Sequence, residues 1–354
     1  MSVDKKFKRF LLIFFCLLGI PVVVVWQAYP YVGRRILSRP VAEADYLESL
    51  RNNSKIGCAT LLARQPEILL IGNSGSYTMW DARRLQRITG MRVGGCMLGG
   101  ASGETLLHIM ELVRELKTPP KQIILGTNIY MFVDSENRTL QNQMHVALLD
   151  EARAPYTFWT EAYLKEMLHK QLFPASAKAQ DEAITLHAPR LDACEATIDR
   201  EIRRHLPKSI EAVKKAQGAR RLPDFGKNVA DEVCRSVKEL GSRLWVVNIP
   251  VGPLAESYYT DEVRKYYQMV LDQFGSCAER VVNLKAEEYG LKDKHYVNRY
   301  LENVDYDKWR DGNAEKLEYD PDHANPIGAA LFTDRAARFL TGGDAGKVAG
   351  NDHL

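Results

Sequence analysis

The residue best suited to chemistry is a serine that directly follows a short apolar run. Ser74 comes after Glu67-Ile-Leu-Leu-Ile-Gly72-Asn, and such an aliphatic run is typical of a parallel strand covered on both faces. Gly72 and Gly75 on either side permit a sharp turn. A serine at the carboxyl end of a parallel strand lies where open α/β sheets bind their ligands. The alternative is an ordinary loop in which Ser74 only caps a helix.

A histidine and an aspartate near the C-terminus could activate this serine. Asp320 and His323 lie three residues apart in Tyr319-Asp-Pro-Asp-His-Ala-Asn-Pro326. His323 would accept the proton of the Ser74 hydroxyl and return it to a leaving alcohol, and Asp320 would hold the imidazole in the useful tautomer. Asp322 is adjacent to His323 and cannot easily face the back of its ring, so Asp320 is the predicted partner.

Two further loops offer groups that could stabilise an oxyanion. Gly103 and Asn128 each follow an apolar run, at residues 91–98 and 122–125. The N–H groups of Ser74 and Gly103 and the side-chain amide of Asn128 are the predicted donors, and one such donor is typically worth about 10²- to 10³-fold in rate. Taken singly, an asparagine such as Asn128 is more often a turn residue, and a glycine such as Gly103 more often starts a helix.

Alternating strands and helices must position these residues. Strand-like runs occur at residues 67–72, 91–98, 122–125, 244–249 and 280–284, and helical spacing occurs at 77–89, 104–116, 258–274 and 327–340. This alternation predicts a three-layer α/β/α domain around a flavodoxin-like parallel sheet. Its strands would bring their carboxyl ends to one edge. Asn325 followed by Pro326 predicts the start of the last helix.

Residues 134–240 interrupt the alternation with charged, amphipathic helices and no clear strand. We interpret them as a helical insertion or cap on the sheet domain. Basic side chains in this stretch could meet anionic glycans or lipid headgroups, although a solvated helix face is the simpler interpretation. They are Arg200, Arg203, Arg204, Lys214, Lys215, Arg220 and Arg221.

The N-terminal residues predict a membrane anchor. Basic residues precede an apolar stretch from Phe10 to Trp26, which is about the 20 residues that span a bilayer. A convincing cleavage site does not follow, so residues 1–32 are predicted to be a cytoplasmic stub and an uncleaved, single-pass signal anchor. Residues 33–65 would connect it to a catalytic domain at 66–340 on the periplasmic or extracellular side, and 341–354 would form a flexible tail.

Composition narrows the partners, and the cysteines indicate the compartment. The chain has 354 residues, of which 26% are charged, and a formal net charge of +3, so it carries no nucleic-acid-binding signature.

Cys16 falls within the predicted span. The other five are Cys58, Cys96, Cys194, Cys234 and Cys277. Outside the cytoplasm these would form disulfides, with at least one left over or paired between chains, and the pairing is not readable from the sequence.

Together the four blocks resemble the SGNH (GDSL) hydrolase superfamily. Gly72-Asn-Ser74 resembles its Gly-Asp-Ser block, with asparagine in place of aspartate. Ser102-Gly-Glu-Thr105 resembles the glycine block, Gly126-Thr-Asn128 the Gly-x-Asn block, and Asp320-Pro-Asp-His323 the Asp-x-x-His block before the last helix. The resemblance covers residues 67–128 and 245–340. It implies an SGNH-like fold and a Ser/Asp/His site with no metal or organic cofactor.

An anchored, outward-facing domain of this superfamily resembles proteins that O-acetylate exopolysaccharides or cell-wall glycans in bacteria, and proteins that assist teichoic acid D-alanylation. Such proteins work at the cytoplasmic membrane beside a multi-spanning acyltransferase. The resemblance therefore implies an O-acyltransferase or esterase that acts on an acylated, cell-envelope or exported polysaccharide.

Two other functions remain open at this stage. A lipase or thioesterase at the membrane surface would use the same triad and an exposed apolar groove. A non-catalytic assembly partner of a polysaccharide-modifying complex would keep only the fold, and Asn73 in the nucleophile block is the one hint of it. The triad itself does not separate hydrolysis from transfer.

Overall fold

A computed structural model describes five stretches of the chain, residues 65–133, 138–153, 195–218, 224–297 and 319–341, and a few residues before them. Those are Leu47, Leu50, Gly57, Cys58, Leu61, Leu62 and Arg64. The predicted anchor at 1–32 and the predicted tail from 342 onward lie outside these stretches. Among the helices that are described, none is long and apolar enough to cross a membrane.

Five parallel strands form the central sheet. Their order is β2-β1-β3-β4-β5, and every neighbouring pair is parallel. The strands are β1 (Ile68–Gly72), β2 (Val93–Met97), β3 (Gln122–Thr127), β4 (Arg243–Asn248) and β5 (Arg280–Val282). All five predicted strands are confirmed. The order is that of a flavodoxin-like sheet and is consistent with an SGNH-like fold.

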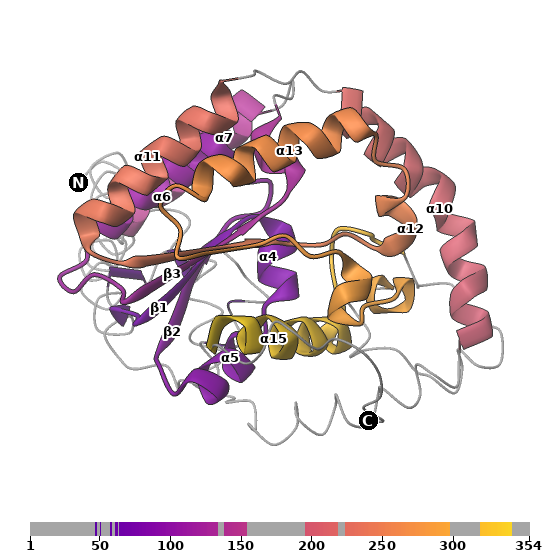
Figure 1. The fold of residues 1–354 in the computed structure, drawn as a ribbon, viewed down its shortest axis with the longest axis horizontal. Helices are drawn as coiled ribbons and strands as arrows, with labels where there is room; N and C mark the ends of the chain where they lie inside the picture. Colours follow the sequence, from indigo (N-terminus) through magenta and orange to yellow (C-terminus); the bar gives the residue numbers. More distant parts are fainter. Residues whose placement is uncertain are drawn as a thin grey trace, which may run out of the picture. The chain divides into compact units, whose positions relative to one another are not determined.

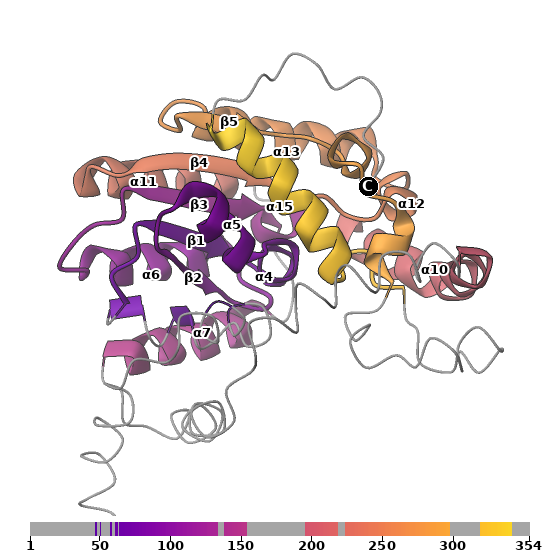
Figure 2. The same cartoon turned by 90° about the horizontal axis from the view of Figure 1, so that it is seen from below.

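Helices cover both faces of the sheet, which gives the three predicted layers (Figures 1 and 2). One face carries α6 (Gly103–Arg114), α11 (Phe225–Leu240) and α13 (Asp261–Phe274), and the other carries α4 (Ser74–Met79), α5 (Ala82–Thr89) and α15 (Pro326–Thr341). Two longer helices add to these, α7 (Arg138–Arg153) and α10 (Glu195–Gly218). The short helices are η1 (Ile129–Phe132), α12 (Pro253–Glu256), η2 (Ala286–Tyr289) and η3 (Asp293–Tyr296).

Helix α11 lies in the stretch interpreted as an insertion, yet it packs on the sheet between α6 and α13 (Figure 1). Val229, Val233 and Val237 are buried in the same core cluster as strands β1, β3 and β4. Helix α11 thus completes the crossover from β3 to β4, as a parallel pair requires. The extra chain between β3 and β4 therefore includes one helix of the basic α/β layer.

Helix boundaries differ from the sequence pattern at one site and agree at another. The single helix expected at residues 77–89 is two helices, because Trp80 is extended and Asp81 caps a new start by accepting the Arg84 N–H at 2.8 Å. The start of α15 is as predicted. There Asn325 Oδ1 accepts the N–H of Gly328 at 3.0 Å, and Pro326 is the first helical residue.

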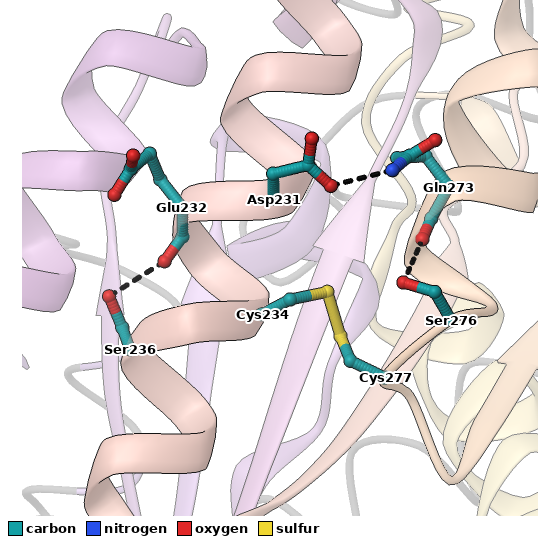
Figure 3. The surroundings of a disulfide bond; sticks show 7 residues. All are labelled: Asp231, Glu232, Cys234, Ser236, Gln273, Ser276 and Cys277. Carbon is teal, nitrogen blue, oxygen red and sulfur yellow. Dashed lines mark hydrogen bonds between the residues drawn. A yellow bond between two sulfur atoms is a disulfide. The ribbon is translucent and has the colours of Figure 1, made fainter.

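Two disulfides join elements far apart in the sequence. Cys58 bonds to Cys96 in β2, and Cys234 in α11 bonds to Cys277 just after α13. Figure 3 shows the second bond, beside a hydrogen bond from Gln273 to Asp231 that joins the same two helices. Disulfides persist in oxidising compartments, so the pair indicates an extracytoplasmic domain. The fifth cysteine, Cys194, lies outside the described residues.

Removal of the Cys58–Cys96 bond should destabilise the domain. The bond closes a separation of 38 residues, for which restriction of the unfolded chain predicts about 2–4 kcal/mol. We expect the Cys58→Ser/Cys96→Ser variant to unfold at correspondingly lower urea concentration. Exposed Ser276→Ala is the control. Peptide mapping of the oxidised protein that recovers Cys58 and Cys96 in other linkages would contradict the pairing.

Candidate active site

The candidate site lies at the point where the strand order reverses. Strand β1 lies between β2 and β3, so the loops that follow these two strands flank the loop that follows β1. Ser74 follows β1, Gly103 follows β2 and Asn128 follows β3. Open α/β sheets bind ligands at such switch points. The sheet thus brings the three predicted oxyanion residues to one edge.

Helix α4 approaches the sheet so closely that only glycine fits beneath it. A Cβ on Gly72 would lie 2.1 Å from Ser76 Oγ, and one on Gly126 would lie 2.4 Å from the same atom. Ser76 Oγ also donates to the carbonyl of Gly126 at 3.1 Å. Glycine is therefore needed at positions 72 and 126 for the same reason, which is that Ser76 Oγ occupies the space that a side chain at either position would enter.

Ser74 is the first residue of α4, and Asn73 caps that helix. Asn73 Oδ1 accepts the Gly75 N–H at 3.1 Å, and the Asn73 carbonyl accepts the N–H of Ser76 at 3.0 Å. The N–H of a first helical residue has no acceptor within its own helix, which suits Ser74 as an oxyanion donor. Ser74 is partly exposed between buried neighbours, so a substrate can reach it.

Asp320 and His323 form a hydrogen-bonded pair. Asp320 Oδ2 lies 2.7 Å from His323 Nδ1, the arrangement in which a carboxylate orients an imidazole. The pair lies beside the first turn of α4. The His323 ring centre is 6.5 Å from that of Tyr77, and the Asp322 carbonyl would lie 3.3 Å from a Cβ on Gly75. His323 is therefore on the same side of the sheet as Ser74, and its catalytic role remains a prediction.

Gly103 opens α6 in tight contact with α11. A Cβ at this position would lie 2.7 Å from Val229 Cγ2, so no larger residue fits without displacing α11. Ser102 caps α6, because its Oγ accepts a hydrogen bond from the Thr105 N–H at 3.4 Å. Like Ser74, Gly103 is a first helical residue with an N–H that no acceptor of its own helix can reach.

Two residues of α7 hold this glycine block, and the sequence analysis assigned neither a role. Asn142 Oδ1 accepts from Ser102 Oγ at 2.7 Å and from Thr105 Oγ1 at 3.0 Å, and its Nδ2 donates to Glu104. His145 lies 2.9 Å from Thr105 Oγ1 and 3.1 Å from the Gly99 carbonyl. The polar spacing in residues 142–145 does not distinguish them from a solvated helix face, so no sequence signal identified them.

Asp322 is a partly buried residue at this edge. Its Oδ1 is shielded from solvent and has no hydrogen-bond partner among the described residues. Burial, and after it the charge of Asp320, raise the pKa of Asp322 from 3.8 to about 6, and His323 opposes the shift. The pKa values of Tyr130 and Tyr259 are also raised, mainly by burial of these side chains and in part by the negative charge of Asp322.

A cavity of about 370 Å³ lies along the carboxyl ends of β3, β4 and β5, a size common for ligand pockets. Of the predicted site residues, Asn128 lines this cavity, whereas Ser74, Gly103, Asp320 and His323 do not. Asn128 and Ile249 line it on the side of the candidate site. Polar and charged side chains form much of the remaining wall, including Glu256, Arg264 and Lys285. Glu256 and Arg264 form a 3.2 Å ion pair in this wall. Apolar side chains, among them Ile249, Val251 and Val263, also line the cavity.

The arrangement is compatible with acyl transfer. It brings to one edge of the sheet a partly exposed serine at a helix start, an imidazole that a carboxylate orients, and the three groups predicted to bind an oxyanion. These parts define an α/β domain with a candidate serine nucleophile site. No known family model matches the chain, and neither the curated proteins nor the solved structures contain a significant match.

The raised pKa of Asp322 predicts a pH-dependent stability. Between about pH 4 and 6 the folded protein holds a proton at Asp322 that the unfolded chain has released, so stability falls as the pH rises through this range. We expect Asp322→Asn to be more stable than the wild type at pH 7.5, by about 1–3 kcal/mol, and much less so at pH 4. Urea unfolding at both values measures this.

The matched control for this pH prediction is Asp272→Asn, which changes an exposed aspartate on α13. Its effect should be small and similar at both pH values. A stability difference between Asp322→Asn and the wild type that does not change with pH would contradict the prediction.

Proposed function

We propose that this chain is a serine acyl-enzyme O-acyltransferase or esterase of the SGNH type. The observation that carries the proposal is the 2.7 Å bond between Asp320 and His323 beside the helix turn that begins with Ser74. A histidine that an aspartate orients in this way can act as the base that a serine nucleophile requires.

The reaction would proceed in two balanced halves. Ser74 Oγ attacks the acyl carbon of an ester while His323 takes its proton, and the Ser74 and Gly103 N–H groups with Asn128 bind the oxyanion. His323 then gives the proton to the leaving alcohol as the ester C–O bond breaks, which leaves an acyl-Ser74. A second hydroxyl, from a sugar in transfer or from water in hydrolysis, then attacks this acyl-enzyme while His323 again accepts the proton. The bond between the acyl carbon and Ser74 Oγ breaks, and His323 returns the proton to Ser74 Oγ, which regenerates the free serine.

In particular, we propose that the chain works outside the cytoplasmic membrane on an acyl, preferably acetyl, ester of a cell-envelope or exported polysaccharide. The two disulfides support the compartment. The polar and charged side chains in the cavity beside Asn128 offer hydrogen-bonding groups to a polyhydroxylated substrate. The N-terminal anchor and a multi-spanning membrane acyltransferase partner belong to the same proposal, on the resemblance to envelope O-acetylation proteins.

The test uses the full chain in detergent with p-nitrophenyl acetate and a fluorophosphonate probe. We expect Ser74→Ala and His323→Ala to lose at least about 10³-fold in kcat/KM and to lose labelling, because nucleophile and base act as a unit. Ser276→Ala at an exposed position and His108→Ala at a half-buried position on α6 are the matched controls, and both should keep activity. Acetyl transfer to added polysaccharide, measured by mass spectrometry, separates transferase from esterase.

Folded wild-type protein that neither labels nor turns over, alone or in membranes containing its acyltransferase partner, would contradict the proposal. That result would favour the non-catalytic assembly partner. Preferential cleavage of long-chain esters would favour the lipase instead.

A further inference from the structure

Two buried asparagines form a hydrogen-bonded pair between the nucleophile loop and the loop after β3. Asn73 Nδ2 donates to Asn128 Oδ1 at 2.9 Å, and each residue is only 5% exposed. Asn73 Oδ1 is also occupied, because it accepts the Gly75 backbone N–H at 3.1 Å. The pair thus links the cap of α4 directly to a predicted oxyanion donor.

The backbone determines the orientation of both amides. The Gly75 N–H can only donate, so Asn73 must present its oxygen there and its amino group to the other side. That amino group can only donate, so Asn128 must present its oxygen to Asn73. Turning either amide over would set two donors or two acceptors against each other in a buried site, which is strongly unfavourable. The Nδ2 group of Asn128 therefore faces away from Asn73.

We propose that Asn73 is a positioning residue that orients the carboxamide of Asn128, leaving its Nδ2 hydrogens available to the oxyanion. This inference rests on the proposed function, since it assigns Asn73 a part in the same site. Asn128 lines the cavity, and with its oxygen engaged by Asn73, the amino group is the polar end of that side chain left for a ligand.

The asparagine at position 73 then acquires a physical reason. An aspartate there could still accept the Gly75 N–H, but it has no hydrogen to give to Asn128 Oδ1. Asn128 would have to turn over and present its amino group to the carboxylate. Asn73 and Asn128 are therefore a matched pair in this chain, and the departure from Gly-Asp-Ser is not a mark of a degraded site.

The decisive variant is Asn73→Asp in the full chain. Aspartate caps helices as well as asparagine does, so the cap of α4 is kept. Because a carboxylate at this buried position can lower stability, kcat is measured under conditions where urea unfolding shows the variant to be fully folded. With p-nitrophenyl acetate we expect kcat to fall at least about 10-fold with little change in KM, since a transition-state donor is misdirected. Asp81→Asn is the matched control, because it exchanges the same two residue types at the cap of α5 and should leave kcat unchanged.

A double-mutant cycle shows whether Asn73 acts through Asn128. We expect Asn128→Ala to lower kcat about 10²- to 10³-fold, and the added Asn73→Asp change to have little further effect in that background. A purely structural role predicts that Asn73→Asp retains wild-type kcat, because the helix cap is intact. That result, or full additivity of the two losses, would overturn the proposal.

A spectroscopic readout separates this inference from the proposed function. In protein labelled with ¹⁵N-asparagine, Asn73→Asp should shift the side-chain amide resonances of Asn128 as its amino group turns to the carboxylate. Unchanged Asn128 resonances would overturn the orientation argument. A third outcome is that the resonances shift but the wild-type protein shows neither turnover nor labelling. The proposed function and the catalytic part of this inference would then fail, whereas the orienting contact between Asn73 and Asn128 would stand.

Discussion

The structure depends above all on how closely the short helix α4 lies on strands β1 and β3. Ser76 Oγ occupies the space that a Cβ on Gly72 or Gly126 would need and bonds to the Gly126 carbonyl. This contact holds the first turn of α4 directly at the carboxyl ends of the two central strands. Ser74 consequently projects from a buried, well-anchored turn, and Asn73 comes within reach of Asn128 on the neighbouring strand.

The acid–base pair reaches this turn from the other end of the chain. Backbone bonds from Asp320 to Tyr296 and from Gly252 to Pro321 hold the loop that carries His323. Helix α15 follows that loop and is tied to α5 through a hydrogen bond from Asp81 to Thr333 and an ion pair between Arg84 and Asp334. Because α5 follows α4 directly in the chain, these contacts connect the helix after His323 to the segment that carries Ser74.

Helix α7 supports the third loop of the site. It comes from the stretch that interrupts the strand–helix alternation, yet Asn142 and His145 bond to the Ser102–Thr105 segment and to Gly99. The same stretch supplies α11, whose Val229 packs on Gly103. Part of the supposed insertion therefore positions the glycine block, and changes in it are expected to reach the site through these contacts.

The sequence by itself determined the features that depend on neighbouring residues. Aliphatic runs identified β1, β3 and β4 most directly, because a parallel strand covered on both faces must be apolar on both. The Asn325-Pro326 pair identified the start of α15. The Asp-x-x-His spacing led to the Asp320–His323 bond because both residues lie in one short loop. The catalytic roles of these residues are not decided by such local patterns.

Only the tertiary structure decided the features that depend on distant residues. The two disulfide pairings, the place of α11 in the sheet layer and the Asn142 bonds each join segments that the sequence separates widely. The orientation of Asn128 is the clearest example. This orientation follows from two linked hydrogen bonds, from the Gly75 N–H to Asn73 and from Asn73 to Asn128. Asn73 and Asn128 are 55 positions apart in the sequence. No local pattern carries that information, because the direction of a hydrogen bond depends on which groups the fold brings face to face.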